Sequence, residues 1–176
     1  MEVYLIRHTT PKAIKGICYG QSDVELEDAF TAEAEKVLGQ LPSKFDAVYS
    51  SPLSRCKRLA ELVAPNHVKY DNRLKEVNFG TWELRPWNDI PPSELNPWMK
   101  DFVNLSSPQG ESLLDLHHRV LEWWQEVQAE NPGKIAIITH AGVIRVLLAK
   151  FRGIPLDKCF SDISVEHGEV VCSSVL

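Results

Sequence analysis

The sequence lacks long apolar runs and has no excess of positive charge. No stretch of its 176 residues is apolar for the roughly 20 positions that a membrane-spanning helix requires. The first residues, MEVYLIRH, lack the basic segment, apolar core and cleavage site of a secretory leader. The formal net charge of -5 gives no electrostatic basis for general binding to nucleic acid. We therefore expect a cytoplasmic protein with neither a nucleic-acid nor a membrane partner.

Cysteine pairs and several catalytic signatures are also missing. Cys18, Cys56, Cys159 and Cys172 are scattered without a C-x-x-C pair, so we expect free thiols rather than disulfides or a zinc cluster. The chain contains no C-x5-R, no G-x-x-x-x-G-K-[ST], no H-E-x-x-H and no D-x-D near its start. These absences argue against thiolate, P-loop and most metal-dependent chemistry. We expect no metal and no cofactor.

Short apolar runs alternate with helical patterns along the chain. The length suits one domain covering residues 1–176. Three runs rich in β-branched or aromatic residues predict buried strands at 3–6, 45–50 and 134–140, and helical spacing predicts helices at 26–41, 51–64, about 111–130 and 141–153. This alternation predicts an α/β fold, a three-layer sandwich with a mostly parallel central sheet and helices on both faces.

Two segments depart from this alternation. The stretch from about 71 to 108 is rich in proline and tryptophan in broken patterns, which predicts a lid or insertion with a functional role. A further short strand is expected at 67–71. The C-terminal residues 161–176 are predicted to form a closing hairpin around His167-Gly168.

Basic side chains follow the predicted strands at the edge where parallel sheets bind ligands. Arg7 and His8 end the first strand, and His140 ends the strand at 134–140. Arg55 lies in the first turn of the helix that follows the second strand. Any one of these residues alone is more often a polar group leaving the core or a solvated cation. Four together repel one another unless an anion compensates, and guanidinium groups match phosphate oxygens, so the sequence predicts a phosphoryl site.

With the other routes poorly supported, a histidine nucleophile remains. A neutral imidazole can attack phosphorus, and neighbouring arginines disfavour protonation of the ring. His117 and His118 lie inside a helical pattern far from a strand end, and we interpret them as structural or solvated. His8 is therefore the residue expected to become a phosphohistidine.

Five motifs in order make the prediction more specific. They are L-I-R-H-T at 5–9, S-S-P-L-S-R-C at 50–56, L-K-E-V-N-F-G-T-W-E at 74–83, G-E-S at 110–112 and I-T-H-A-G-V-I-R at 138–145. This series resembles the histidine phosphatase superfamily, also called phosphoglycerate mutase-like, and spans most of the chain.

The resemblance implies a role for each matching residue. His8 would accept the phosphoryl group, and Arg7, Arg55 and His140 would hold its oxygens, with His140 also counted as catalytic. Glu76 would donate a proton to the leaving oxygen and then activate water, because a bound phosphate dianion favours the protonated form of a neighbouring carboxylic acid. Glu83, in the same segment, is the rival acid.

The sequence departs from the family pattern at three positions. Thr9 stands where the family usually has glycine, which leaves less room beside the phosphate. Ile14 replaces an asparagine that often helps to bind phosphate, and Leu59 replaces a common threonine. These changes can reshape the pocket without removing its principal groups.

The choice of substrate depends on finer likenesses. Val77 follows the acid where mutases carry arginine, and C-Y-G-Q-x-D-V at 18–24 with F-G-x-W-E most resembles α-ribazole phosphatases, which act in cobalamin assembly. Tyr19, Trp82 and Glu83 are the candidates for contacting the rest of a small-molecule phosphate monoester, by stacking in the aromatic cases. A broad sugar-phosphate phosphatase, a mutase-type enzyme and a non-catalytic phospho-ligand module remain alternatives. A homodimer is compatible with the sequence.

Overall fold

A mixed five-stranded sheet lies at the centre of the computed structural model, which describes residues 1–12 and 15–175. The strand order is β3-β2-β4-β1-β5, and every neighbouring pair is parallel except β1 with β5. The strands are β1 (Glu2–Arg7), β2 (Ala47–Ser50), β3 (Val68–Tyr70), β4 (Lys134–Thr139) and β5 (Val170–Ser174). The predicted α/β class with a mostly parallel sheet is confirmed.

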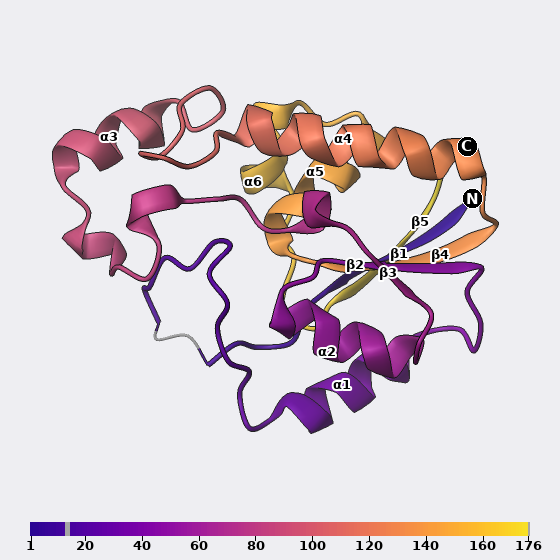
Figure 1. Cartoon of the computed structure of the whole chain (residues 1–176). Helices are drawn as coiled ribbons and strands as arrows, with labels where there is room; N and C mark the ends of the chain where they lie inside the picture. Colours follow the sequence, from indigo (N-terminus) through magenta and orange to yellow (C-terminus); the bar gives the residue numbers. More distant parts are fainter. Residues whose placement is uncertain (13–14, 176) are drawn as a thin grey trace.

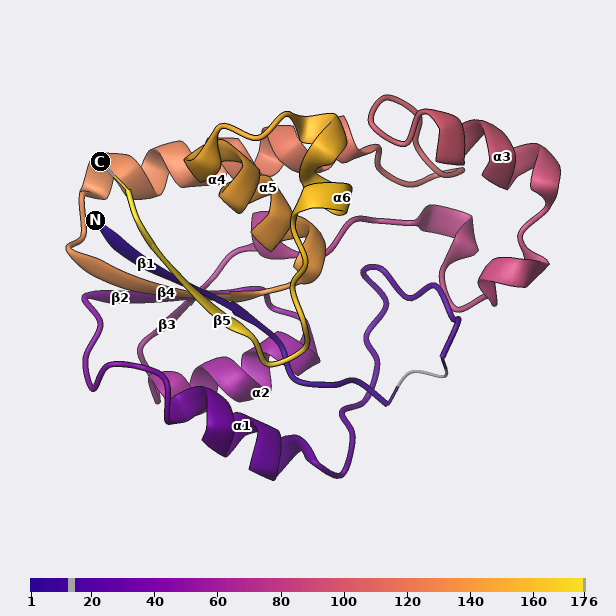
Figure 2. The ribbon, with the colours of Figure 1, turned by 180° about the vertical axis from the view of Figure 1, so that it is seen from behind.

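Helices cover both faces of this sheet (Figure 1). One face carries α1 (Phe30–Leu38) and α2 (Ser54–Val63), and the other carries α4 (Leu113–Glu130), α5 (Ala141–Arg152) and the short α6 (Cys159–Asp162). Figure 2 shows the same two helical layers from behind. None of the described helices is long and apolar enough to cross a bilayer.

Two apolar cores separate these layers because successive strand residues point to opposite faces. Val3 and Leu5 of β1 pack toward α4 and α5, whereas Ile6 packs toward α1 and α2. Strand β4 divides in the same way, with Ile137 in the first core and Ile138 in the second. Burial on both faces explains why these strands appear in the sequence as continuous apolar runs.

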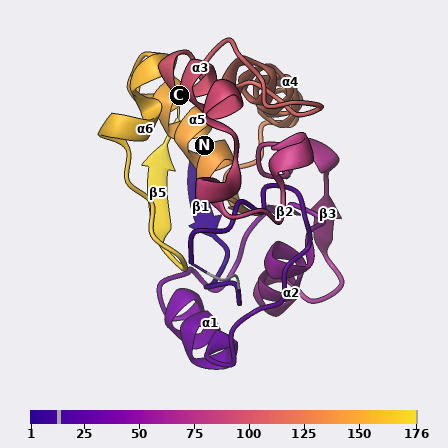
Figure 3. The same cartoon turned by 90° about the vertical axis from the view of Figure 1, so that its left-hand side faces the viewer.

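The lid predicted for 71–108 leaves the sheet beyond the carboxyl ends of its strands. Figure 3 views the molecule from this side, with the lid in front of the sheet. The lid contains α3 (Pro92–Lys100) and three short 3-10 turns, at Asn72–Leu74, Gly80–Trp82 and Trp87–Asp89. Trp82 and Ile90 of the lid form a small buried cluster with Cys18. The sequence does not predict helix α3, because Pro91 at its N-cap and Pro92 and Pro97 within it break the pattern that marks a helix.

Two other expectations require correction. The helix expected at 26–41 is shorter, because residues before Phe30 form turns and Gly39 ends the helix. The closing hairpin expected at 161–176 is wrong. The segment before His167 is not a strand, and β5 instead pairs antiparallel with β1, with Leu5 opposite Val171. The expectation of free thiols is confirmed for all four cysteines.

Candidate active site

The strand register brings the two histidines of the predicted site side by side. Arg7 at the end of β1 lies opposite Thr139 at the end of β4, so His8 and His140 leave the sheet together. The His8 N–H donates to the Thr139 carbonyl at 3.0 Å, and the two imidazole centres lie 5.1 Å apart. Parallel pairing of two strands distant in sequence therefore creates the core of the site.

His8 is held as a neutral imidazole with a defined proton position. Its side chain is 2% exposed, and Nδ1 lies 2.7 Å from the carbonyl oxygen of Thr9. Since a carbonyl can only accept, the proton resides on Nδ1 and Nε2 carries the lone pair. Burial lowers the pKa of His8 well below its usual value, and the charges of Arg55 and Arg7 lower it further. The ring is thus neutral at pH 7, with a free lone pair on Nε2.

Arg55 is a fully buried cation in the first turn of α2. Its Nε–H donates to Nδ1 of His140 at 3.3 Å, and its two terminal nitrogens donate to the carbonyls of Ser22 at 2.8 Å and Gly20 at 2.6 Å. A guanidinium has five N–H donors, so these contacts leave two for another acceptor. No carboxylate among residues 1–12 and 15–175 pairs with this buried guanidinium, which therefore suits an anionic ligand.

His140 links Arg55 to the second strand. Because Arg55 donates to Nδ1, the neutral ring carries its proton on Nε2, which donates to the Ser51 hydroxyl at 2.8 Å. Burial lowers the pKa of His140 well below its usual range, and the neighbouring His8 and Arg55 lower this pKa further. Both ring nitrogens are engaged, so direct contact with a phosphoryl oxygen requires the ring to exchange Ser51 for that oxygen.

Arg7 is oriented by His167, which the sequence predicts in a hairpin turn. One terminal nitrogen of Arg7 donates to the Val165 carbonyl at 2.7 Å, and the other lies 2.8 Å from Nε2 of His167. Burial and the charge of Arg7 lower the pKa of His167 to about 4, so His167 is a neutral acceptor. The Arg7 Nε is buried without a hydrogen-bond partner among the described residues. No sequence motif marks His167, because its place depends on β5 returning beside β1.

Glu76 brings a carboxylate to the amino end of α5, directly after His140. Its oxygens accept from the Gly142 N–H at 3.2 and 3.3 Å and from the Val77 N–H at 3.0 Å. A Cβ on Gly142 would lie 2.3 Å from Oε1 of Glu76, so glycine is needed for this approach. The Glu76 carbonyl accepts from Arg119 and Gln21, which fixes the backbone that carries the acid.

Glu83 has a different position and is not suited to be the acid. Its carboxylate accepts from the N–H of Gln21, the N–H and hydroxyl of Ser22, and the N–H of Phe79. Those four donors occupy both oxygens. Glu83 therefore joins the lid to the 20–22 loop, and the expectations of a rival acid or a substrate contact are corrected.

The remaining sequence candidates divide between the site and the lid. Tyr19 is half-buried, with its ring 5.3 Å from the Arg55 guanidinium, and so adjoins the site. Trp82 is fully buried and donates to Glu94 at 2.8 Å, so the expected stacking on substrate is wrong for this residue. Thr9 adopts no positive φ, which explains why glycine is not required there. Ile14 lies outside the described residues.

The assembled groups favour an anion over a cation. Within residues 1–12 and 15–175, no cluster of three or more His, Cys, Asp or Glu side chains is arranged to hold a metal. Arg7 and Arg55 have N–H donors without partners among the described residues, and His8 is a neutral imidazole. The Glu76 carboxylate lies at Gly142, two residues after His140. Such a set can bind a tetrahedral oxyanion, attack it and exchange a proton with its leaving group.

Known proteins share this fold and sequence pattern. The family model of the histidine phosphatase superfamily (branch 1) matches residues 3–173. The solved α-ribazole phosphatase of Shigella flexneri has a TM-score of 0.89 at 25% identity, with 98% of this chain and 89% of that chain covered. A Yersinia pestis protein that carries the name of a phosphoglycerate mutase, GpmB, is 30% identical over 168 residues, covering 88% of this chain and 76% of its own. A Hydrogenobacter thermophilus protein that carries the name of a phosphoserine phosphatase is 26% identical over 168 residues, covering 90% and 82%.

Proposed function

This chain belongs to the histidine phosphatase superfamily, and we propose that it hydrolyses phosphate monoesters through a phosphohistidine formed at His8. One observation carries the proposal. His8 is buried and neutral, its proton is fixed on Nδ1, and the charges of Arg7 and Arg55 disfavour its protonation. A nucleophile must keep its lone pair, which the neutral Nε2 of His8 does. The phosphoryl group needs fixed cations, which Arg7 and Arg55 supply.

The proposed first step transfers the phosphoryl group to the protein. Nε2 of His8 attacks phosphorus in line as the phosphorus–oxygen ester bond breaks, and Glu76 gives a proton to the departing alcohol oxygen. Arg7 and Arg55 stabilise the charge on the equatorial oxygens with N–H donors that are already oriented. His140 supports this step by fixing Nε of Arg55.

The proposed second step returns His8 to its starting state. Water attacks phosphorus, the phosphorus–nitrogen bond breaks, and the Glu76 carboxylate takes a proton from the water. Phosphate leaves and no metal or cofactor takes part.

For the physiological substrate we propose α-ribazole 5'-phosphate or the corresponding cobamide phosphate, in cobalamin biosynthesis. The support is the likeness to the Shigella flexneri α-ribazole phosphatase and the C-Y-G-Q-x-D-V and F-G-x-W-E segments. Relatives with phosphoserine phosphatase and phosphoglycerate mutase names define the competing substrates.

Two measurements test this function. The protein is mixed with a ³²P-labelled ester and quenched in alkali, and we expect acid-labile label on His8 in the wild type and none in His8→Ala. We then compare kcat/KM in EDTA for α-ribazole 5'-phosphate, phosphoserine, 3-phosphoglycerate and p-nitrophenyl phosphate, with His8→Ala as the blank. Appreciable turnover by a clean His8→Ala preparation would refute the nucleophile. A preference for phosphoserine or 3-phosphoglycerate would refute the α-ribazole assignment alone.

A further inference from the structure

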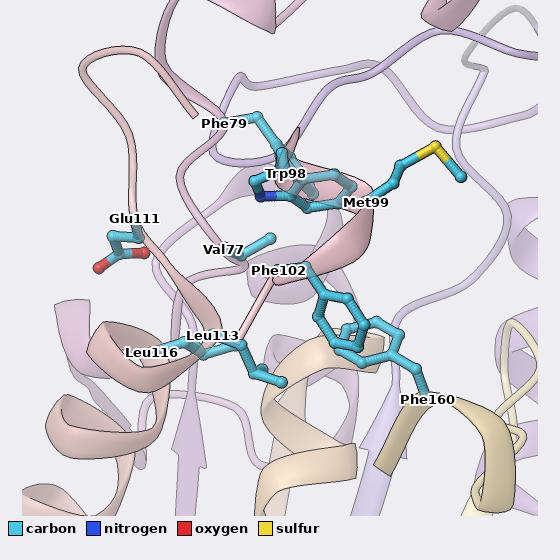
Figure 4. Close-up of a pocket in the computed structure, with 9 residues that line it drawn as sticks. All are labelled: Val77, Phe79, Trp98, Met99, Phe102, Glu111, Leu113, Leu116 and Phe160. Carbon is cyan, nitrogen blue, oxygen red and sulfur yellow. The ribbon is translucent and has the colours of Figure 1, made fainter. Parts of the chain in front are cut away.

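An apolar pocket lies between the lid and the helices on the α4 side of the sheet (Figure 4). Its volume is about 270 Å³. The lid contributes Val77, Phe79, Trp98, Met99 and Phe102, and the helices contribute Leu113, Leu116 and Phe160, with Glu111 at one side. Eight of these nine side chains are hydrophobic.

The pocket adjoins the proposed acid. Val77 directly follows Glu76 in the chain and lines the pocket. Leu116 and the Glu76 carboxylate both lie beside Gly142. A Cβ built on this glycine would be 3.2 Å from Cδ2 of Leu116 and 2.3 Å from Oε1 of Glu76. The Glu76 carboxylate therefore lies close to Leu116, one of the residues that line the pocket.

The charge in the pocket lining is already neutralised. Oε1 of Glu111 accepts from Arg119 Nε at 2.8 Å, and Oε2 accepts from Arg119 NH2 and the Asn78 N–H, both at 2.9 Å. No lysine or arginine is among the lining residues. Burying the carboxylate of phosphoglycerate or the two charges of phosphoserine here would leave them without partners, which is costly.

Two of the apolar residues that line the pocket are exposed at the protein surface. Met99 is 62% exposed and Phe160 is 44% exposed. Phe160 is held in place by Phe102, with ring centres 5.6 Å apart, and by the Arg145 guanidinium, 4.8 Å from its ring centre. Exposed apolar side chains around a cavity commonly mark a binding site.

We propose that this pocket binds an aromatic part of the alcohol that leaves, so that the preferred substrates are phosphate monoesters with an apolar ring. The proposal rests on the phosphatase function above and names the substrate class for that site. An apolar cavity of about 150 Å³ holds one benzene ring, so about 270 Å³ accommodates a fused two-ring system. Phe79, Trp98, Phe102 and Phe160 supply ring edges and faces for stacking.

Two esters of primary alcohols isolate the contribution of the ring. We expect kcat/KM for 1-naphthylmethyl phosphate to exceed that for ethyl phosphate by about 10- to 100-fold, the range expected from burying one large apolar group. The double variant Met99→Ala/Phe160→Ala should reduce this ratio about tenfold, through a larger loss on the naphthyl ester than on ethyl phosphate. Leu84→Ala is the matched control, because Leu84 is also a lid residue and, like Met99, 62% exposed, yet does not line the pocket. Equal kcat/KM for the two esters, or an equal loss on both in the double variant, would overturn the proposal.

A binding measurement separates the pocket from the chemistry. The His8→Ala protein is titrated with both esters by calorimetry. We expect tighter binding of the naphthyl ester, and we expect Met99→Ala/Phe160→Ala in the same background to reduce this advantage about tenfold. Tight binding of this ester without any turnover by the wild type would refute the phosphatase and retain the pocket. No difference in affinity between the esters would refute the pocket even if the phosphatase is active.

Discussion

The proposed role of Glu76 as proton donor can be tested by comparing substrates whose leaving groups differ in their need for a proton. An alkoxide needs a proton as it departs, whereas p-nitrophenolate scarcely does. We expect Glu76→Gln to reduce kcat/KM for ethyl phosphate by about 10²- to 10³-fold and for p-nitrophenyl phosphate by less than about tenfold. Steady-state kinetics with both esters measures this difference. Equal losses on the two esters would remove Glu76 from the acid role.

At the residue scale, the position of a residue after a predicted strand was a better guide to the site than its residue type alone. Arg7, His8, Arg55 and His140 could be placed together because each follows a strand or begins the next helix, and the structure joins them as expected. His167 was missed, because its contact with Arg7 spans 160 positions and requires the C-terminal strand to lie beside β1. Trp82 and Glu83 were assigned to the substrate, because sequence does not show whether a side chain is buried or already bonded.

At the element scale, the lid and the site are joined through the 20–22 loop. Glu83 of the lid accepts from the N–H groups of Gln21 and Ser22, and Arg55 donates to the carbonyls of Gly20 and Ser22. The loop is therefore hydrogen-bonded both to the lid and to the buried arginine.

Removing the lid carboxylate should disturb Arg55 without touching the acid. We expect Glu83→Ala to lower kcat/KM about 10- to 100-fold, because four donors lose their acceptor and the loop no longer holds the guanidinium in place. The loss should be the same for ethyl and p-nitrophenyl phosphate, unlike that of Glu76→Gln. Glu25→Ala serves as the control, because it removes an exposed carboxylate shortly after the 20–22 loop. A loss confined to ethyl phosphate would show that Glu83 acts as a proton donor after all.

Strands and helices could be predicted from the sequence where their apolar pattern was uninterrupted. They were harder to predict where proline breaks the pattern or where the partner of a strand is distant. The buried strands β1, β2 and β4 agree with the expected runs, because burial on both faces leaves an uninterrupted apolar signal. The C-terminal strand was recognised as extended, but the pattern of one strand does not identify its partner. Helix α3 was hidden by its prolines, two of which occupy its start, where they are tolerated.

At the scale of the whole molecule, the buried histidines make stability depend on pH. The pKa values of His8, His140 and His167 are lowered in the folded state, so the unfolded chain binds more protons below about pH 6.5. Stability is therefore fully present above that pH and is lost as the pH falls through the interval below it. Each additional proton taken up on unfolding adds about 1.4 kcal/mol per pH unit to the slope.

Urea unfolding between pH 5 and pH 8 tests this dependence. We expect the free energy of unfolding to fall as the pH drops below about 6.5, and we expect His8→Asn to show a shallower fall. His118→Gln is the control, because His118 is exposed on α4 and should leave the wild-type slope intact. A wild-type curve that is flat from pH 7 to pH 5 would contradict the buried, neutral histidines.

The strand order also constrains when the site can form during synthesis. Strand β1 lies between β4 and β5, so both of its neighbours are made more than 120 residues after it. A chain emerging from the ribosome therefore carries an apolar β1 without partners until β4 appears, and such non-local pairing is slow and exposes the chain to aggregation. His8 is translated before His140 and His167, so its surroundings are complete only after β4 and β5 have been made.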